Sequence, residues 1–338
     1  MESMKNKEPV PHPVFKVVMN GKDVTAVLSP YLLSVKYTDF EEGEADTLDI
    51  TVEDTDGKFR GPWYPVKGQT LEMEFGYDGQ QLHKTGLFEI DDIVGQGPPD
   101  VVVIRGIAAG VKHQFRTRQG KAYDNTTLAA IAQQVARRLK LKLVGKVEPI
   151  QIARVTQINE TDLTFLRRLS GEYGYAFSVK GAMMVFVKRT DLRNSKPILS
   201  IDRTDLANYH VRDKIMGVAT SAQVSYHDPK TKLLKHYRVQ DTRRATSGDV
   251  IKLNVRAESD AQAKAKANAA LEKANEDATQ LELTPTDGNP MLVAGINFDL
   301  TGLGKFGGTF HVIKSTHDID RSGAYKTDVE AKRVLING

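Results

Sequence analysis

Residues 45–57 read ADTLDITVEDTDG, and this stretch gives the clearest structural signal in the chain. Apolar side chains occupy every second position, at Leu48, Ile50 and Val52. Such an alternation is typical of a half-buried strand in an antiparallel sheet. The same alternation follows at Leu71, Met73 and Phe75, and again at Phe88 and Ile90. Turn signals separate these runs, so residues 14–107 are predicted to form a small β-barrel or sandwich.

A helical period replaces the alternation after about residue 110. Apolar residues three and four positions apart predict one helix face: Leu128, Ile131, Ala132, Val135 and Leu139. Its expected cap is one of three polar residues, Asp124, Asn125 or Thr126. A second helix is predicted over 162–173, capped by Asn159 or Thr161 and ended by Gly174. A hairpin over 175–188 completes what we predict to be an α+β insertion.

Alternating segments return after about residue 193, and Ser259-x-x-Gln262 opens an alanine-rich helix with a capping box. The fold class is therefore predicted as mainly β with an α+β insertion. We predict three parts: a first antiparallel β-barrel over 10–108, the insertion over 109–192, and a second antiparallel β-barrel over 193–338. The strands of 193–240 fit either barrel in this scheme.

Two segments of the chain resemble each other. Gly86-x-Phe88-x-Ile90 and Gly308-x-Phe310-x-Val312 each begin a strand, and each is followed by a glycine-containing turn and another strand. This match predicts two related β-modules on either side of an insertion.

The glycine-rich loop TGLGKFGGTF, residues 301–310, has the spacing of a dinucleotide fingerprint. Such a site needs a helix directly after the glycines, because the helix N-terminus binds the pyrophosphate. An alternating, strand-like segment follows instead, and Phe306 stands where a phosphate loop has Ser or Thr. The loop is therefore predicted to be a hairpin connection. The Asp54–Gly57 stretch is likewise predicted to be a turn, because Phe59 and Pro65 replace the Gly and Glu of a calcium loop.

No residue pattern predicts a catalytic, cofactor or metal site. The chain has no cysteine, which excludes disulfides, thiolate zinc sites and cysteine nucleophiles. Eight histidines lack the i, i+4 spacing of a helical zinc site, and we expect them at the surface. His311 and His317 are six residues apart and are expected on one strand face. The many carboxylates leave a glycosidase-like pair open, although nothing places two of them around a cleft.

Charge is distributed unevenly along the chain. The net charge is +4, but residues 1–108 hold 10 Lys/Arg and 19 Asp/Glu, a net of −9. Nine acidic residues fall between Asp39 and Asp56 without a basic one, whereas residues 112–146 hold nine basic residues and one acidic one. Such opposite patches suit self-assembly between copies or contact with an anionic polymer. The alternative is that the acidic and the basic segment each form a solvated face of the protein.

Candidate interface residues come from these patches and from the loop GPWYP, residues 61–65, which holds the only tryptophan. A tryptophan between prolines either plugs the end of a barrel or anchors an interface. We expect Arg137 and Arg138 to lie off the apolar helix face, free to contact a partner. The candidates are Trp63, Tyr64, Arg116, Arg118, Arg137, Arg138, Glu41, Glu42 and Glu44. The acidic segment 39–56 of one copy is expected to meet the basic segment 112–146 of its neighbour.

Long segments of the chain resemble one protein family. They are NGKDVTAVLSPYLLSVKYTD (20–39), ADTLDITVEDTDGKFRGPWYPVKG (45–68), RTRQGKAYDNTTLAAIAQQVA (116–136), LTFLRRLSGEYGYAFSVKG (163–181) and DRSGAYKTDVEAKR (320–333). Together they resemble the late control protein D family, the baseplate hub of contractile phage tails. Hubs of headless bacteriocins and injection systems are similar, and the resemblance does not separate them from a phage.

This resemblance implies a structural protein without catalytic residues. Each subunit would contribute two barrels similar to the tail-tube subunit, and three subunits would form a ring that adapts a sixfold tube to a threefold spike. The implied partners are two further copies, the central spike trimer and the tube or tube-initiator proteins, with the tape-measure protein as an additional one. The implied location is the tail baseplate of a virion or particle that is assembled in the bacterial cytoplasm. Nucleic acid would only pass through the lumen of a phage particle.

Two other classes of function remain open from the sequence. One is a peptidoglycan hydrolase associated with a hub, and the other is a nucleic-acid-binding module that uses the basic segment 112–146. The N-terminal MESMKNKEPVPHPVF has no apolar core, so no signal peptide is expected. No apolar stretch reaches the roughly 18 residues of a spanning helix, so no membrane partner is expected.

Overall fold

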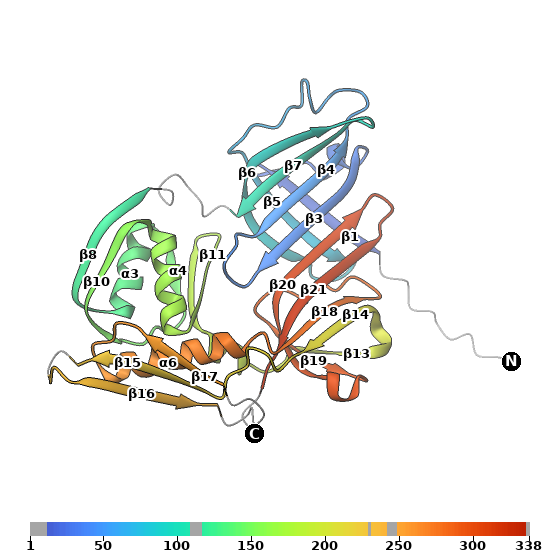
Figure 1. The fold of residues 1–338 in the computed structure, drawn as a ribbon. Coiled ribbons are helices and arrows are strands. Elements are labelled where there is room, and N and C mark those ends of the chain that lie inside the picture. Colours follow the sequence, from blue (N-terminus) through green and yellow to red (C-terminus); the bar gives the residue numbers. More distant parts are fainter. Residues whose placement is uncertain (1–11, 109–116, 229–230, 242–248, 336–338) are drawn as a thin grey trace.

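The computed structural model describes residues 12–108, 117–228, 231–241 and 249–335, and places them as two β-modules and two α+β segments (Figure 1). Arg116 and part of the basic segment lie outside the described residues. The chain is mainly β, as predicted, and a 13-stranded sheet runs through both modules. Among the described helices, none has the length and apolarity that crossing a bilayer requires.

The first β-module contains the strands that the alternating N-terminal sequence predicts. Its elements are β1 (Pro13–Met19), β2 (Lys22–Asp23), α1 (Thr25–Leu28), β3 (Leu32–Phe40), β4 (Thr47–Glu53), β5 (Thr70–Tyr77), β6 (His83–Gln96) and β7 (Val101–Ala108). The alternating apolar side chains meet in one core, which includes Leu48, Ile50, Val52, Leu71, Met73, Phe75 and Phe88. Full burial of each such side chain stabilises the fold by about 1.5–3 kcal/mol.

The first inserted segment has the predicted α+β order. Its elements are β8 (Arg118–Thr127), α3 (Leu128–Arg138), β9 (Lys142–Val144), β10 (Gln151–Thr161), α4 (Asp162–Tyr173), β11 (Tyr175–Lys180), β12 (Met183–Lys188) and α5 (Arg189–Arg193). The predicted apolar face of α3 is buried. Its cap, however, is Thr127, one residue beyond the predicted candidates, because β8 stays extended up to that position and its hydroxyl reaches the amide of Ala130. Thr161 caps α4, and Gly174 ends it in the left-handed region at φ 78°, as predicted.

The second β-module forms from strands on either side of another segment. Its elements are β13 (Leu199–Asp202), η1 (Arg203–Asp205), β14 (Leu206–Asp213), β18 (Thr279–Pro285), β19 (Asn297–Thr301), η2 (Gly304–Phe306), β20 (Gly308–Asp320) and β21 (Tyr325–Arg333). The glycine-rich loop joins β19 to β20 through the short 3-10 turn η2, which agrees with the predicted hairpin connection.

The remaining segment lies between β14 and β18 and does not join the large sheet. It comprises β15 (Ser221–His227), β16 (Leu234–Gln240), β17 (Val250–Asn254) and α6 (Asp260–Asn275). The strands order as β16-β15-β17, and α6 packs its small side chains, Ala263 and Ala267, into their core. Figure 1 places α6 beside the green insertion, where it contacts α4. The strands within 193–240 thus pair with β17, β18, β19 or one another, and none of the described ones pairs with β1–β7.

The two β-modules have the same strand order. The first reads β1-β5-β6-β7-β4-β3 across the sheet, and the second reads β13-β19-β20-β21-β18-β14. If the two-residue strand β2 is left out, each module has six strands, and numbering them along the chain gives the order 1-4-5-6-3-2 in both cases. One pairing differs, because β1 and β5 are antiparallel whereas β13 and β19 are parallel. The predicted internal repeat is confirmed by this order.

The repeated motif marks equivalent positions in the two modules. Phe88 and Phe310 are both buried in the fifth strand, although β6 already begins at His83, ahead of the motif, whereas β20 begins with it at Gly308. Two residues later each strand has a β-bulge, between Ile90 and Asp92 in β6 and between Val312 and Lys314 in β20. A bulge inserts one unpaired residue and shifts the alternation of side chains by one position. The same motif and the same bulge therefore shape both modules.

The two modules are not separate closed barrels, which corrects the predicted fold. The second half of β20 continues past its bulge and pairs antiparallel with β3, from Lys314 opposite Phe40 to Asp320 opposite Ser34. This ladder fuses the two modules into one sheet whose path ends at β2 and β14, and no pairing between described strands closes it. The reason is that β19 pairs only with residues 308–311 of β20, which leaves the same side of β20 beyond the bulge free to pair with β3.

Candidate functional site

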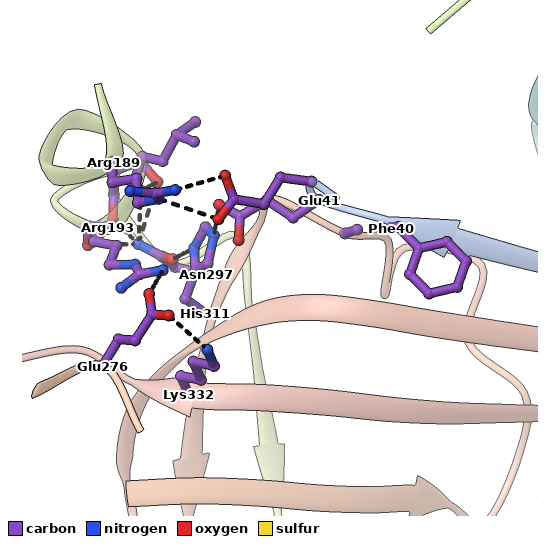
Figure 2. A network of polar contacts seen from close by, with 12 residues as sticks. Phe40, Glu41, Arg189, Arg193, Glu276, Asn297, His311 and Lys332 are labelled. Atoms are coloured by element: carbon purple, nitrogen blue, oxygen red, sulfur yellow. Dashed lines mark hydrogen bonds and ion pairs between the residues drawn. The ribbon is translucent and has the colours of Figure 1, made fainter. Parts of the chain in front are cut away.

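The connection between β3 and β4 forms a buried polar junction with other parts of the chain. We use the term polar junction for Asp39, Glu41, Glu42 and Asp46 together with the basic side chains that they contact, Lys180, Arg189 and His311. These basic residues come from the first insertion and from the second β-module (Figure 2). The junction therefore connects three parts of the molecule.

His311 lies at the centre of this junction and is fully buried. Its Nε2 lies 2.8 Å from Glu41 Oε1, and its Nδ1 lies 2.5 Å from Asn297 Oδ1. The Asn297 amide donates in turn to the backbone carbonyls of Arg193 and Ser195, at 2.9 and 2.7 Å. Both ring nitrogens therefore face side-chain oxygen atoms, one from the first module and one from the second. Burial alone would raise the pKa of Glu41, but the hydrogen bond from His311 and nearby Arg193 lower it below its usual value.

Two arginines of α5 extend the junction toward α6. Arg189 donates from Nε and Nη2 to the two oxygens of Glu42, at 3.1 and 3.0 Å, a two-point contact that fixes orientation. Arg193 donates to Glu276 at 3.4 Å, and Lys332 of β21 lies 3.1 Å from the same carboxylate. Figure 2 shows Glu276 between Arg193 and Lys332. The short helix α5 is therefore held between both β-modules.

Lys180 forms the second centre of the junction. It lies at the tip of the β11–β12 hairpin and contacts Asp39, both carboxylate oxygens of Asp46 at 2.8 Å, and the carbonyl of Phe40 at 2.8 Å. Burial would lower the pKa of Lys180, but the two carboxylates raise it above its usual value. Burial and the neighbouring Asp39 raise the pKa of Asp46 to about 6 despite the attraction of Lys180. Asp39 also accepts from the amide of Ala294, at 2.9 Å, which connects the junction to the second module.

The chemistry of this junction is that of paired charges. Its carboxylates are engaged by basic side chains or backbone amides, as buried charges require. Within the described ranges, no group of three or more His, Asp or Glu side chains is arranged to hold a metal ion. The arrangement can fix the relative positions of three parts of the chain.

A polar hollow lies on the shared sheet between the two modules. Its volume is about 400 Å³, and its lining includes Lys36, His210, Glu282, Lys314, Thr316 and Glu330. These residues come from β3, β14, β18, β20 and β21, so the hollow crosses the ladder that joins the modules. Alternation places Lys36 and Thr316 on the face opposite the buried Val35 and Ser315. The solvent-facing side of the shared sheet is thus polar and charged.

The acidic interface candidates separate into inward and outward residues. Glu41 and Glu42 point into the polar junction, which corrects their prediction as exposed contacts, while Glu44 is exposed. The physical reason is that the basic partners for these acids lie within the same chain, more than 140 residues away. Asp54 is also buried and accepts from the amides of Phe59 and Arg60, at 2.7 and 3.1 Å, in the predicted turn.

The basic and aromatic candidates also differ from one another. Arg118 and Arg137 are exposed, but Arg138 is not free: it donates to Asp162 at 2.8 Å and to the Tyr123 hydroxyl at 3.1 Å. Trp63 and Tyr64 are 41% and 51% exposed. The Trp63 ring contacts Tyr31 and Phe59 edge-on, and Lys58 lies 5.1 Å from its centroid. Trp63 thus covers the end of the first core and keeps an exposed face as well.

Sequence reasoning missed the two central histidines. His311 and His317 were expected at the surface and on one strand face, and both are fully buried. The extra residue in β20 is Ile313, since Val312 pairs with Ala331 and Lys314 pairs with Glu330. This bulge lies between the histidines and shifts the alternation, so His317 turns toward the first core while His311 turns toward the polar junction. Both bulges are features of strand pairing, so the sequence pattern carried no signal of them.

Comparison with known proteins places the chain in a family. The model of the phage tail baseplate hub family (GPD) matches residues 94–323, more than half of the chain. The chain belongs to this hub family. The family is a structural baseplate hub family and not an enzyme family, and its members are components of the tail baseplate.

Curated hub relatives support the same family. The probable baseplate hub protein of Escherichia phage P2 is 31% identical over 227 residues, 64% of this chain and 58% of the relative. That of Escherichia phage 186 is 33% identical over 178 residues, 52% of this chain and 45% of the relative. The matched part thus spans about half the length of these hub proteins.

A solved structure extends the fold comparison to nearly the whole chain. A tail protein from Neisseria meningitidis MC58 matches with a TM-score of 0.70 at 12% identity, covering 95% of this chain and 97% of that one. At this identity the match speaks for the fold alone. It includes both β-modules and both α+β segments, since little of the chain lies outside it.

Proposed function

We propose that three copies of this hub-family chain form a ring that joins a sixfold tail tube to a threefold central spike. The observation that carries this proposal is the repeated strand order 1-4-5-6-3-2 of the two β-modules. Two similar modules per chain give three chains six similar units, which a sixfold tube could contact in equivalent ways. The shared motif and bulge strengthen the case, because equivalent contacts need equivalent surfaces.

The rigid connection between the modules also supports this role. Six quasi-equivalent units require a fixed rotation between the two modules of one chain. The β20–β3 ladder and the polar junction both fix that rotation, the first through backbone hydrogen bonds and the second through buried ion pairs. We place the polar face of the shared sheet at the inner wall of the ring, where a hydrated channel favours charged side chains.

The test is the mass and shape of the assembly. The chain is mixed with its cognate spike protein, and native mass spectrometry counts the copies of each. Electron-microscopy class averages, computed without imposed symmetry, then count the density lobes. Three copies with six similar lobes are expected. A chain that stays monomeric with the spike, or a ring with another number of copies, would overturn the proposal.

A further inference from the structure

Each β-module contains a fifth strand with a bulge, but only one of these strands is paired on both sides beyond the bulge. In β20 the residues after the bulge pair with β21 on one side and with β3 on the other. In β6 the equivalent residues, 92–96, pair with β7 alone among the described strands. β14 is the counterpart of β3, and it pairs with β18 alone among these strands. The chain therefore presents two strand edges that correspond to the two sides of its internal ladder.

We propose that residues 92–96 of β6 in one copy pair antiparallel with residues 210–214, at and just after β14, in the next copy. This inference rests on the proposed ring and names the contact that closes it. The intermolecular ladder would repeat the β20–β3 ladder, so that module-to-module contacts alternate within and between chains. Such a head-to-tail contact uses two different surfaces of each copy, and it closes into a ring when the rotation matches.

The repeat fixes the register of this ladder. The bulges align Ile90 with Val312, and the residues paired to them, Gly106 and Ala331, are therefore equivalent. Gly106 pairs with Leu48 and Ala331 pairs with Leu281, so these two leucines are equivalent. Each leucine pairs in turn with one residue of the next strand, which makes Tyr37 equivalent to Val211. Transferring the β20–β3 register to the new pair gives three opposed pairs on the polar face: Asp92 with Lys214, Val94 with Arg212, and Gln96 with His210.

The side chains at these edges fit the predicted pairing. Asp92 faces Lys214, an opposite-charge pair that contributes roughly 0.2–1 kcal/mol in an antiparallel ladder. Ile93 is partly buried against the first core, as a residue equivalent to the buried Ser315 should be. Directly after β14 the chain exposes two apolar residues, Ile215 at 58% and Met216 at 84%. Residues that follow an open strand edge in this way would be covered by a neighbouring copy.

One chain cannot make this contact with itself. The two edges lie far apart in the sheet, because the path from β14 to β6 passes through β18, β21, β20, β3, β4 and β7. An open edge normally carries features that block further pairing, such as proline or an inward charge. Residues 92–96 read DIVGQ and residues 206–213 read LANYHVRD, and neither run contains proline. A second copy of this chain is thus the partner that fits both edges.

Cysteine cross-linking tests the register, because the chain has no cysteine of its own. The variant Val94→Cys/Arg212→Cys places thiols at directly opposed positions, about 4.5–5.5 Å apart between Cβ atoms in such ladders. The matched control is Thr38→Cys/Thr316→Cys, the equivalent pair inside one chain, whose hydroxyls lie 3.5 Å apart. A second control, Val94→Cys/Asn208→Cys, shifts the partner by four residues. After mild oxidation, non-reducing gels and light scattering give covalent and total mass.

The expected result is a covalent dimer and trimer for Val94→Cys/Arg212→Cys, an internal disulfide at unchanged mass for Thr38→Cys/Thr316→Cys, and at least a tenfold lower yield for the shifted pair. A trimer by light scattering that does not cross-link at 94 and 212 would overturn this ladder and leave the proposed ring intact. A chain that is monomeric in both measurements with the cognate spike protein present would overturn the ladder and contradict the ring as well.

Discussion

His317 illustrates how burial changes the chemistry of a single residue. Its ring stacks on Tyr37 at 6.0 Å between centroids and lies 4.8 Å from Phe75, and its Nδ1 lies 2.8 Å from the Tyr325 hydroxyl. Burial, with a smaller effect of His83, lowers its pKa from 6.5 to about 3. The side chain is therefore neutral in the folded protein at neutral pH.

This pKa predicts that stability falls on acidification. The unfolded chain binds a proton at His317 near pH 6.5, whereas the folded chain binds it only near pH 3. The contribution of neutral His317 to the free energy of unfolding is thus fully present above about pH 6.5. It is lost as the pH falls toward 3, at up to about 1.4 kcal/mol per pH unit. Urea unfolding between pH 7 and pH 4 measures the slope. His317→Gln should show a flatter profile, and an identical slope would contradict the assignment.

Lys180 illustrates the opposite case, a charge that the fold needs. Lys180→Met leaves Asp39 and Asp46 facing each other without a cation, so we expect a loss of about 3 kcal/mol in the free energy of unfolding. The control is Lys326→Met, whose ion pair with Asp328 is exposed and should change stability by less than about 0.5 kcal/mol. Denaturant titration of both variants measures the difference. Equal effects would mean that the polar junction does not stabilise the fold.

At the scale of the elements, the β20 bulge lets one strand serve two modules. Before the bulge Phe310 and Val312 pack into the second core, and after it Ile319 packs into the first. The inserted residue changes the positions that face the apolar cores from even to odd numbers, so each half of the strand presents an apolar side chain to its own core. Without that shift, one half would turn its polar residues inward.

Deleting Ile313 should therefore leave both halves of β20 facing their own cores, because it removes only the inserted residue. Strict alternation from Val312 then still keeps Lys314 and Thr316 outside and Ser315 inside, so we expect a folded variant that is less stable by about 1–3 kcal/mol through loss of the local bend. Ile313→Ala keeps the bulge, and because this side chain is only half-buried it should cost about 1 kcal/mol. Soluble yield and thermal unfolding of both variants test this expectation. A deletion variant that fails to fold would contradict it and show that the bend of the bulge is itself required.

Local elements could be predicted from the sequence, whereas contacts between them could not. The α4 boundaries, Thr161 and Gly174 follow from propensities and caps that act over a few residues. The polar junction joins residues that are about 130 to 270 positions apart, and no local pattern pairs Asp46 with Lys180 or Glu41 with His311. The repeat was visible as three matching positions, but the fusion of the two modules was not, because a strand shared between modules looks like any other strand.

At the scale of the whole molecule, the charge asymmetry acts mostly within the chain. The acidic segment was expected to meet the basic segment of a neighbour, yet Asp39, Glu41, Glu42 and Asp46 contact partners in their own chain. Assembly through the β6–β14 ladder depends on backbone hydrogen bonds and apolar contacts. The association between copies should therefore depend weakly on salt.

The corresponding measurement is oligomer mass against ionic strength. Raising the salt from about 0.1 M to about 1 M shortens the Debye length from about 10 Å to about 3 Å and screens exposed charge pairs. We expect an unchanged trimer mass by light scattering over this range. The control is Asp92→Asn, which removes the opposite-charge pair of Asp92 with Lys214 from the proposed ladder. Its trimer mass should be equally independent of salt. Dissociation at high salt would instead favour closure by the 39–56 and 112–146 segments.

The β20–β3 ladder also has a mechanical consequence. Its hydrogen bonds lie perpendicular to the strands, so a force directed along the strands would stretch all of them together, whereas a force across them would break them one after another. A single-molecule pull along the strand axis should therefore meet much greater resistance than a pull at right angles to it. The two modules would transmit a thrust as one stiff body and would not bend at a flexible hinge.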